Sequence, residues 1–330
     1  MQKIIKKYII TYIISWQITD KHQISKVNVV ENLEQVDDLK IKITKCFITK
    51  KDINLYAGKT EDANYPITPG YIAVGQICEI VNESNYFTKG QKVYLSQDEN
   101  SNETGFLKEF TVINKKHCHL LPQAVSEYEA LFINHLSIAL SVIDALKIDK
   151  GEYVAVVGGS ILGNLIAQLL SYYKAVPILI DDNDYNLEIS KKTDIFYSIK
   201  ADRLVEQDVI NITGGRKCKK VIYVTDNDLS FETSLSLASN DAMIAVTGIM
   251  NPIQKFNLNS AFKKNLTVKF ISHGEENIGT SINLLVQKAV NLTYFQLNDY
   301  KFDYIAKQFE NASANLEINN NKTEFTVNLL

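Results

Sequence analysis

The sequence predicts an α/β protein in which a β-rich part is followed by a doubly wound parallel sheet. Up to about residue 125, short apolar strands alternate with turn signals. From Ser126 the apolar spacing becomes helical, and strands then alternate with helices at the spacing of a parallel sheet. Within that region, Val154 to Asp181 has the strand–turn–helix–strand order of a βαβ unit.

Length and composition fit a globular protein of two domains. A chain of 330 residues is too long for one ordinary hydrophobic core. The composition is 45% hydrophobic and 22% charged, and the net charge of -3 gives no reason to expect a nucleic-acid partner. No apolar stretch approaches the length of a membrane span, which is about 20 residues. We therefore expect neither a nucleic-acid nor a membrane partner.

The β-rich part contains five candidate strands. They are Tyr8–Trp16, Asp38–Cys46, Ile72–Val81, Gln91–Ser96 and Phe106–Ile113, with turn signals at Ala57-Gly58, Pro69-Gly70, Lys89-Gly90 and between Asn100 and Gly105. The first run follows three lysines, as in a signal peptide, but it contains polar residues and no small-x-small site follows it. A first strand pair is therefore favoured over a signal peptide.

The cysteines indicate a reducing compartment. Cys46, Cys78, Cys118 and Cys218 are scattered and form no C-x-x-C pair, so neither a zinc cluster nor a redox dithiol is indicated. We expect reduced thiols in a cytoplasmic protein.

Helical and strand patterns alternate through the second part. Ser126 and Glu129 form the capping-box pattern of a helix start. Helices are expected at Leu187–Lys192, Phe231–Ala238, Thr280–Val290 and Asp303–Asn311, and strands at Val221–Thr225, Met243–Val246, Val268–Ile271 and in the last nine residues.

The turn between residues 158 and 163 has the spacing of a dinucleotide-binding loop. Gly158 allows a tight turn out of the strand, and Gly163 allows close packing of helix and sheet. The helix N-terminus offers N–H groups to a pyrophosphate, and Asp181 is placed to accept hydrogen bonds from a ribose diol. The candidate cofactor-binding residues are Gly158, Ser160, Ile161, Leu162, Gly163 and Asp181.

Ser160 departs from this pattern, because a glycine is expected at its position. Its side chain either obstructs the phosphate, leaving a fold that has stopped binding nucleotide, or donates a hydrogen bond to a phosphate oxygen. Asp181, followed by Asp182 and Asp184, would repel a 2′-phosphate, so NAD(H) is favoured over NADP(H).

Several segments together resemble the medium-chain dehydrogenase/reductase family, the group of the zinc alcohol dehydrogenases. They are residues 38–59 (DLKIKITKCFITKKDINLYAGK), 65–80 (YPITPGYIAVGQICEI), 87–95 (FTKGQKVYL) and 121–143. The resemblance implies a GroES-like catalytic domain, residues 1–125 completed by 275–330, and a Rossmann domain, residues 126–274. It also implies a homodimer or homotetramer that acts on a small-molecule substrate.

The positions that match the family's zinc ligands have changed. The ligand cysteine corresponds to Thr49, whereas Cys46 matches a cysteine that binds no metal. The Gly-His-Glu of the family becomes Gly70-Tyr71-Ile72, and a glutamate becomes Asn134. Residues 96–105 contain no cysteine for the family's second zinc. Because soft and anionic donors are lost, we expect no zinc at either site.

Three residues are candidates for catalysis in place of zinc. Lys51 matches the hydroxyl residue of the family's proton relay and is either a general acid or an exposed lysine. Tyr71 either donates a proton to a substrate carbonyl or fills the empty metal pocket. Tyr65 resembles a tyrosine of the zinc-free reductases in the family, or is a turn residue. His117, Cys118 and His119 suggest ligand spacing, but a surface strand is the better interpretation.

These residues lead to one expected function, a variant of it and one alternative. The first is a zinc-independent NAD(P)(H)-dependent oxidoreductase that reduces an activated C=O or C=C. A variant of it acts on a carrier-bound or peptide-bound alkene. The alternative is a non-catalytic descendant of the family that serves as a binding or assembly subunit.

Overall fold

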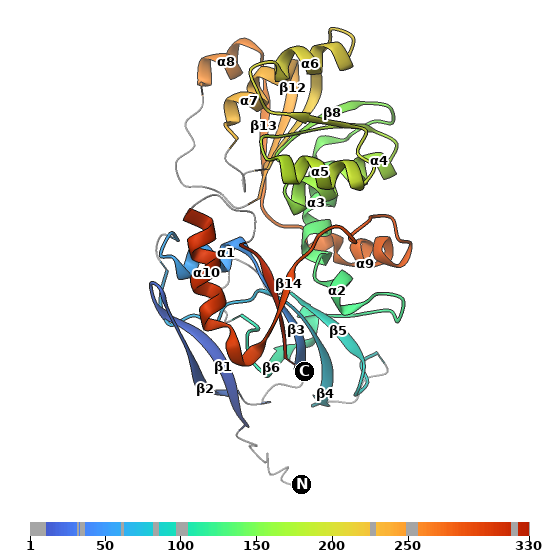
Figure 1. Ribbon diagram of the computed structural model, residues 1–330. Helices are drawn as coiled ribbons and strands as arrows, with labels where there is room; N and C mark the ends of the chain where they lie inside the picture. Colours follow the sequence, from blue (N-terminus) through green and yellow to red (C-terminus); the bar gives the residue numbers. More distant parts are fainter. Residues whose placement is uncertain are drawn as a thin grey trace. The chain divides into compact units, whose positions relative to one another are not determined.

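The chain forms two compact units, which we describe separately. The computed structural model describes residues 11–31, 33, 37–60, 63–81, 86–96, 105–224, 229–248, 257–317 and 323–329 (Figure 1). The first unit comprises residues 1–131 and 297–330, and the second comprises residues 132–296. The domain boundaries expected from the sequence lay at 125/126 and 274/275. The observed boundaries differ, because α9 (Ile278–Val286) packs against α3 (Ile133–Leu146) in the second unit.

The first unit is built mainly from antiparallel strands. The hairpin of β1 (Thr11–Asp20) and β2 (Gln23–Glu31) is the expected strand pair. A larger sheet has the order β14-β15-β3-β4-β5-β7, and β6 pairs with β3. Its strands are β3 (Asp38–Ile48), β4 (Ile72–Ile80), β5 (Lys92–Ser96), β6 (Phe110–Asn114), β7 (Cys118–Leu120), β14 (Asn298–Lys301) and β15 (Phe325–Asn328).

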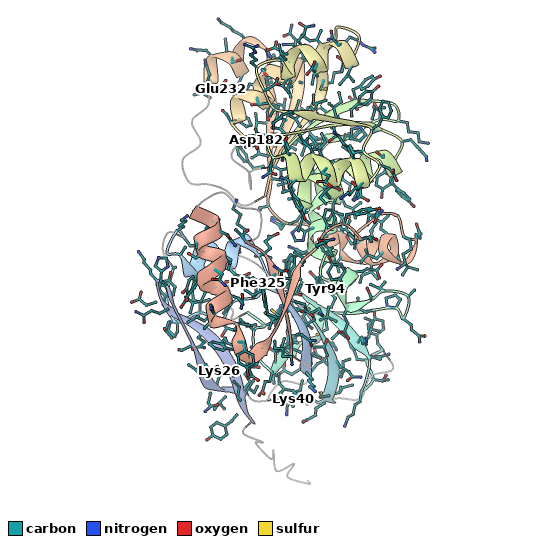
Figure 2. The ribbon with its side chains drawn as sticks, viewed as in Figure 1. Lys26, Lys40, Tyr94, Asp182, Glu232 and Phe325 are labelled. Atoms are coloured by element: carbon teal, nitrogen blue, oxygen red, sulfur yellow. The ribbon has the colours of Figure 1, made fainter. Side chains whose placement is uncertain are left out.

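The end of the chain completes the core of this unit. Phe325 of β15 is buried (Figure 2). It makes an edge contact with Phe309 of α10 (Ala306–Glu317), with ring centroids 5.6 Å apart. Phe309 also lies against Tyr56 at the end of α1 (Lys50–Tyr56). On the hairpin, Trp16 donates from its indole nitrogen to the carbonyl of Phe302. The C-terminal segment therefore belongs to the β-rich unit, because its aromatic residues fill that core.

The second unit contains the expected doubly wound parallel sheet. Its strand order is β10-β9-β8-β11-β12-β13, with parallel pairing throughout. The strands are β8 (Tyr153–Val157), β9 (Val176–Asp181), β10 (Tyr197–Lys200), β11 (Cys218–Val224), β12 (Ala238–Thr247) and β13 (Thr267–Ile271). The further helices are α4 (Ile161–Tyr172), α5 (Asp184–Lys192), α6 (Val205–Ile212), α7 (Phe231–Leu237) and α8 (Leu258–Lys263). The strand order reverses between β8 and β11, which is where open α/β sheets bind ligands.

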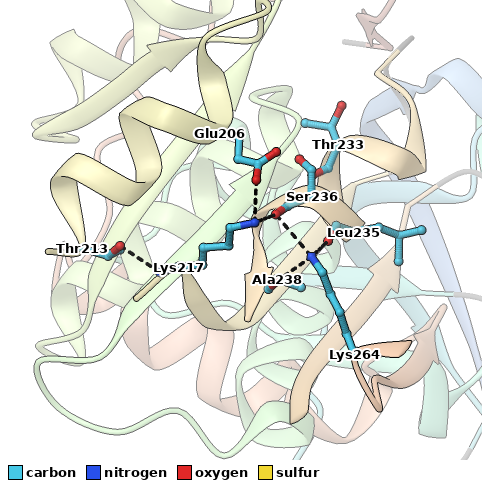
Figure 3. Close-up of polar contacts among 8 residues, drawn as sticks. All are labelled: Glu206, Thr213, Lys217, Thr233, Leu235, Ser236, Ala238 and Lys264. Atoms are coloured by element: carbon cyan, nitrogen blue, oxygen red, sulfur yellow. Dashed lines mark hydrogen bonds and ion pairs between the residues drawn. The ribbon is translucent and has the colours of Figure 1, made fainter. Parts of the chain in front are cut away.

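Two lysines close the C-terminal end of α7, where the chain passes directly into β12 (Figure 3). The ammonium of Lys264 donates to the carbonyls of Leu235 and Ala238, and that of Lys217 donates to the carbonyl of Ser236. Lys217 is also paired with Glu206 of α6 at 2.6 Å. Carbonyls at a helix end lack helical partners, and cations there also oppose the negative end of the helix dipole.

Local sequence signals mostly appear where they were expected. Ser126 and Glu129 exchange hydrogen bonds at the start of α2 (Glu127–Ala130), which confirms the capping box. His117 lies in a 3-10 turn, and β7 begins only at Cys118, so the strand prediction was wrong for His117. The segment that would hold the family's second zinc includes residues 97–104, which lie outside the described residues. In the described part of the chain, no helix is long and apolar enough to cross a membrane.

Candidate functional site

The glycine turn after β8 is too tight for a side chain at two of its positions. Gly158 has a φ of +109°, a backbone conformation that L-residues rarely adopt. A Cβ on Gly163 would lie 1.8 Å from the carbonyl oxygen of Gly158. Both glycines are therefore required for the first turn of α4 to approach the end of the strand.

Ser160 is the N-cap of α4, but its hydroxyl does not cap the helix. An N-cap serine usually accepts a hydrogen bond from one of the first N–H groups of its helix, and Ser160 makes no such bond. Its Oγ is buried and has no hydrogen-bond partner among the described residues. The first helical bond is made by the N–H of Asn164 to the carbonyl of Ser160. The N–H groups of Ile161, Leu162 and Gly163 therefore have no acceptor within the helix.

These features fit the pyrophosphate of a dinucleotide. A buried hydroxyl without a partner and a set of helix N–H groups can all donate to anionic oxygens, and the helix dipole favours negative charge at that point. The close approach permitted by Gly158 and Gly163 brings the backbone within reach of such a group. Ser160 thus adds a donor to the site.

Asp181 lies at the end of β9, but its carboxylate points into the protein. The side chain is buried, with Oδ2 accepting from the N–H of Gly159 and from Nδ2 of Asn186, and Oδ1 accepting from the N–H of Asn183 at 2.7 Å. Burial raises the pKa of Asp181, and these three hydrogen bonds oppose the increase. A carboxylate has about four acceptor positions, which leaves one for a ribose hydroxyl. Asp181 therefore also fixes the glycine turn, a role not anticipated from the sequence.

In the first unit, Lys51 and Tyr71 lie together. The Nζ of Lys51 is 4.7 Å from the centroid of the Tyr71 ring, which is the geometry of a cation–π contact. Lys51 is in the first turn of α1, and Tyr71 directly precedes β4. The structure thus brings together two of the three candidate catalytic residues.

The third candidate, Tyr65, is engaged elsewhere. Its hydroxyl donates to the carbonyl of Leu55 at 2.8 Å, near the end of α1. Burial, together with the charge of Asp20, raises the pKa of Tyr65. The hydroxyl would have to exchange this hydrogen bond before it could donate to a substrate.

Asp52 holds the two segments that carry Lys51 and Tyr71. It is fully buried, and its Oδ1 accepts from the N–H of Gly70 at 2.7 Å. Its Oδ2 accepts from the N–H and the hydroxyl of Thr49. Burial raises the pKa of Asp52, and the hydrogen bonds from Gly70 and Thr49 oppose the rise. Sequence analysis missed this role, although an acid three residues after Thr49 is a helix-start signal.

The residues at the family's zinc-ligand positions do not fit Zn²⁺. The hydroxyl of Thr49 donates to Asp52, and the ring of Tyr71 lies beneath the Lys51 ammonium. A neutral hydroxyl is a poor substitute for a thiolate, and a neighbouring ammonium repels a divalent cation. In the part of the chain that the structure describes, no three His, Cys, Asp or Glu side chains are grouped so that they could hold a metal ion.

Comparison with known proteins gives consistent relatives over most of the chain. A family model for the alcohol dehydrogenase GroES-like domain matches residues 35–123. The L-threonine 3-dehydrogenase of Marinomonas sp. (strain MWYL1) is 24% identical over 310 residues, covering 85% of this chain and 90% of that enzyme. An alcohol dehydrogenase of Escherichia coli CFT073, in complex with NADH, superposes with a TM-score of 0.83 at 17% identity and covers 97% of this chain and 100% of that chain.

Residues 35–123 match the alcohol dehydrogenase GroES-like domain, and over most of its length the chain is similar to dehydrogenases of the medium-chain dehydrogenase/reductase family. Its GroES-like and Rossmann parts correspond to the two architectures expected from the sequence. A second structural neighbour, described as a zinc-binding dehydrogenase of Sinorhizobium meliloti 1021 with NADP bound, has a TM-score of 0.81 at 16% identity and covers 97% of this chain and 100% of that chain. These relatives are dehydrogenases, and the two solved structures contain a nicotinamide cofactor, NADH in the first and NADP in the second.

Proposed function

We propose that this chain is a zinc-independent oxidoreductase that uses NADH to reduce an activated C=O or C=C bond. The observation that carries the proposal is the N-terminus of α4, where the buried Ser160 hydroxyl has no partner in the described part of the chain and lies beside N–H groups that have no helical acceptor. When bound, a reduced nicotinamide supplies a hydride from its C4 atom. The glycine turn would bind the pyrophosphate, and Asp181 would bind a ribose hydroxyl.

Lys51 and Tyr71 would polarise the substrate. In zinc-dependent members of the family a metal ion stabilises the negative charge that develops on the substrate oxygen. An ammonium held over an aromatic ring carries positive charge to the segment where zinc ligands are missing. It would stabilise the oxyanion by charge and hydrogen bonding, with Lys51 or Tyr71 donating the proton. Because these groups are weaker electrophiles than Zn²⁺, substrates that are already conjugated are favoured.

The acidic tip of β9 supports a preference for NADH over NADPH. Asp181 is followed by Asp182, whose side chain is exposed, and by Asp184, which pairs with Lys200 of β10 at 2.6 Å. The lysine offsets only one of the three charges. A 2′-phosphate placed here would meet net negative charge, whereas a 2′-hydroxyl can donate to a carboxylate.

Two measurements on purified protein test the proposal. Titration with NADH, followed by nicotinamide fluorescence, should saturate at micromolar cofactor, and metal analysis should find much less than one zinc per chain. Stoichiometric zinc would contradict the zinc-independent mechanism. Failure to bind NADH at millimolar concentration would leave the non-catalytic binding or assembly subunit as the remaining function.

We also propose a homodimer or homotetramer in the cytoplasm. In the described part of the chain, β13 is an edge strand of the parallel sheet, and Phe270 on it is 68% exposed. Phe262 of the neighbouring α8 is exposed as well. An edge strand with exposed aromatic residues can pair with the same strand of a second copy. Light scattering of the protein and of Phe270→Asp tests this, because the variant should shift toward monomer.

A further inference from the structure

A buried chain of polar side chains links the two elements that would bind the cofactor. Its centre is Asn164, which lies on α4 one turn after Ser160 and is fully buried. Nδ2 of Asn164 donates to Oγ of Ser190 on α5 at 3.2 Å. Oδ1 of Asn164 accepts from Oγ1 of Thr193 at 3.1 Å. A fully buried amide therefore joins α4 to α5.

From Asn164 the chain continues to the carboxylate of Asp181. Oγ of Ser190 donates at 2.8 Å to the carbonyl of Asn186, and Nδ2 of Asn186 donates to Oδ2 of Asp181. The same carboxylate oxygen accepts from the N–H of Gly159 in the glycine turn. The hydrogen bonds therefore return to the turn from which α4 begins and form a closed circuit.

On its other side, Asn164 is fixed by Gln168. Nε2 of Gln168 donates to Oδ1 of Asn164 at 2.9 Å and to the carbonyl of Asn291 at 3.1 Å. Oε1 of Gln168 accepts from the N–H of Asn291. Gln168 thus binds both backbone groups of one residue, and the segment around Asn291 holds α4 in place.

Apolar side chains in place of these polar ones would pack the helices at a lower cost in free energy. A buried amide loses its hydration, which costs free energy unless protein partners replace the water. Networks in which each member is paired are directional, so they define one relative position of the elements they join. Here those elements are the N-terminus of α4 and the tip of β9, which carries Asp181.

We propose that Asn164 is a positioning residue for the cofactor. It would hold the pyrophosphate-binding end of α4 at a fixed distance from the ribose-binding carboxylate of Asp181, through Ser190 and Asn186. This inference rests on the proposed dinucleotide function. It predicts an effect on ligands that contact both elements together, because two linked contacts gain affinity only when their spacing fits.

The test compares adenosine, ADP and NADH as ligands of the purified protein, with calorimetry for the dissociation constants. Adenosine reaches only the ribose contact, whereas ADP and NADH reach both. Asn164→Leu keeps the number and branching of the side-chain heavy atoms and removes the hydrogen bonds. It should lower the affinity advantage of ADP over adenosine by about 10-fold. Asn186→Ala breaks the same circuit on α5 without changing α4 and should lower that advantage in the same direction.

Thr213→Val is the matched control. Thr213 is also buried in this unit, and its hydroxyl donates to the carbonyl of Val209 and accepts from the N–H of Lys217. This variant should lose stability but keep the ratio of the ADP and adenosine affinities. A purely structural role of Asn164 would give the same result for Asn164→Leu, and an unchanged ratio in both network variants overturns the inference.

Binding of the three ligands by the wild-type protein tests the proposed function separately from the role of Asn164. If it binds ADP and NADH more tightly than adenosine, the dinucleotide site stands, and the variants alone decide the role of Asn164. If it binds none of the three ligands, the proposed function is wrong, and the positioning role is overturned with it.

Discussion

The ammonium of Lys51 lies 4.7 Å from the ring centroid of Tyr71, and the carboxylate of Asp52 holds the two segments together. The hydrogen bonds of Asp52 to Gly70 and Thr49 fix α1 against the loop that precedes β4. A cation is thus held beside the positions where the family places zinc ligands.

Replacing Lys51 by methionine should reduce kcat/KM by about 100- to 1000-fold, the usual cost of losing a group that stabilises an oxyanion. NADH oxidation with a panel of conjugated ketones and enals measures this. Lys59→Met is the control, because Lys59 is an exposed lysine just after the same helix. Tyr71→Phe keeps the ring, so full activity in that variant assigns the proton to Lys51. An active Lys51→Met enzyme would remove the lysine from the mechanism.

Ser160→Gly restores the usual glycine but removes the buried hydroxyl. If Ser160 donates to the pyrophosphate, the variant should bind NADH about 5- to 10-fold more weakly, because one hydrogen bond to a charged group is lost. Ser160→Ala removes the same donor and keeps a Cβ, so it should give a similar loss. Tighter binding by the glycine variant in a fluorescence titration would show that the side chain obstructs the phosphate.

The charge of Asp181 should determine the choice between NADH and NADPH. In Asp181→Asn the repulsion of a 2′-phosphate is smaller, so the ratio of NADPH to NADH affinity should rise by about 10-fold. Because Asp181 also binds the N–H of Gly159, the affinity for both cofactors should fall as well. Asp202→Asn, in a residue beyond β10, is the control, and an unchanged ratio for Asp181→Asn would contradict the prediction.

Stability should decrease in mild acid because of His135. Burial lowers the pKa of His135 to about 4 from its usual value near 6.5. Between these two values the unfolded chain binds a proton that the folded chain does not, so stability is lost as pH falls from 6.5 toward 4. The loss is at most about 3 kcal/mol. Urea unfolding of His135→Phe should show a shallower pH dependence, whereas His273→Gln, an exposed histidine, should match the wild type.

Lys264 should stabilise the second unit through the end of α7. Lys264→Met leaves the carbonyls of Leu235 and Ala238 without this donor, which should cost about 1–3 kcal/mol. Lys263→Met removes the same charge from the neighbouring, exposed residue and should be within about 0.5 kcal/mol of the wild type. Equal unfolding midpoints for the two variants would show that the contacts of Lys264 contribute nothing.

Elements with a clear periodic pattern were predictable, and short edge elements were not. The strand at β8, the start of α2 at Ser126 and the parallel order of the second unit follow from apolar spacing and capping signals. In contrast, β10 and β14 have only four residues each and contain no apolar run. Their pairing is decided by the neighbouring strand, because a sheet edge needs backbone partners more than it needs a hydrophobic pattern.

The sequence by itself determined the two-part order of the chain and the glycine turn at Gly158 and Gly163. These depend on residue type and local spacing, which are visible in one dimension. Only the tertiary structure turned the carboxylate of Asp181 toward Gly159 and joined Asn164 to α5. It also left the Ser160 hydroxyl without a hydrogen-bond partner among the residues that the structure describes. Such contacts connect residues far apart in the chain, and burial then determines which polar groups must find partners.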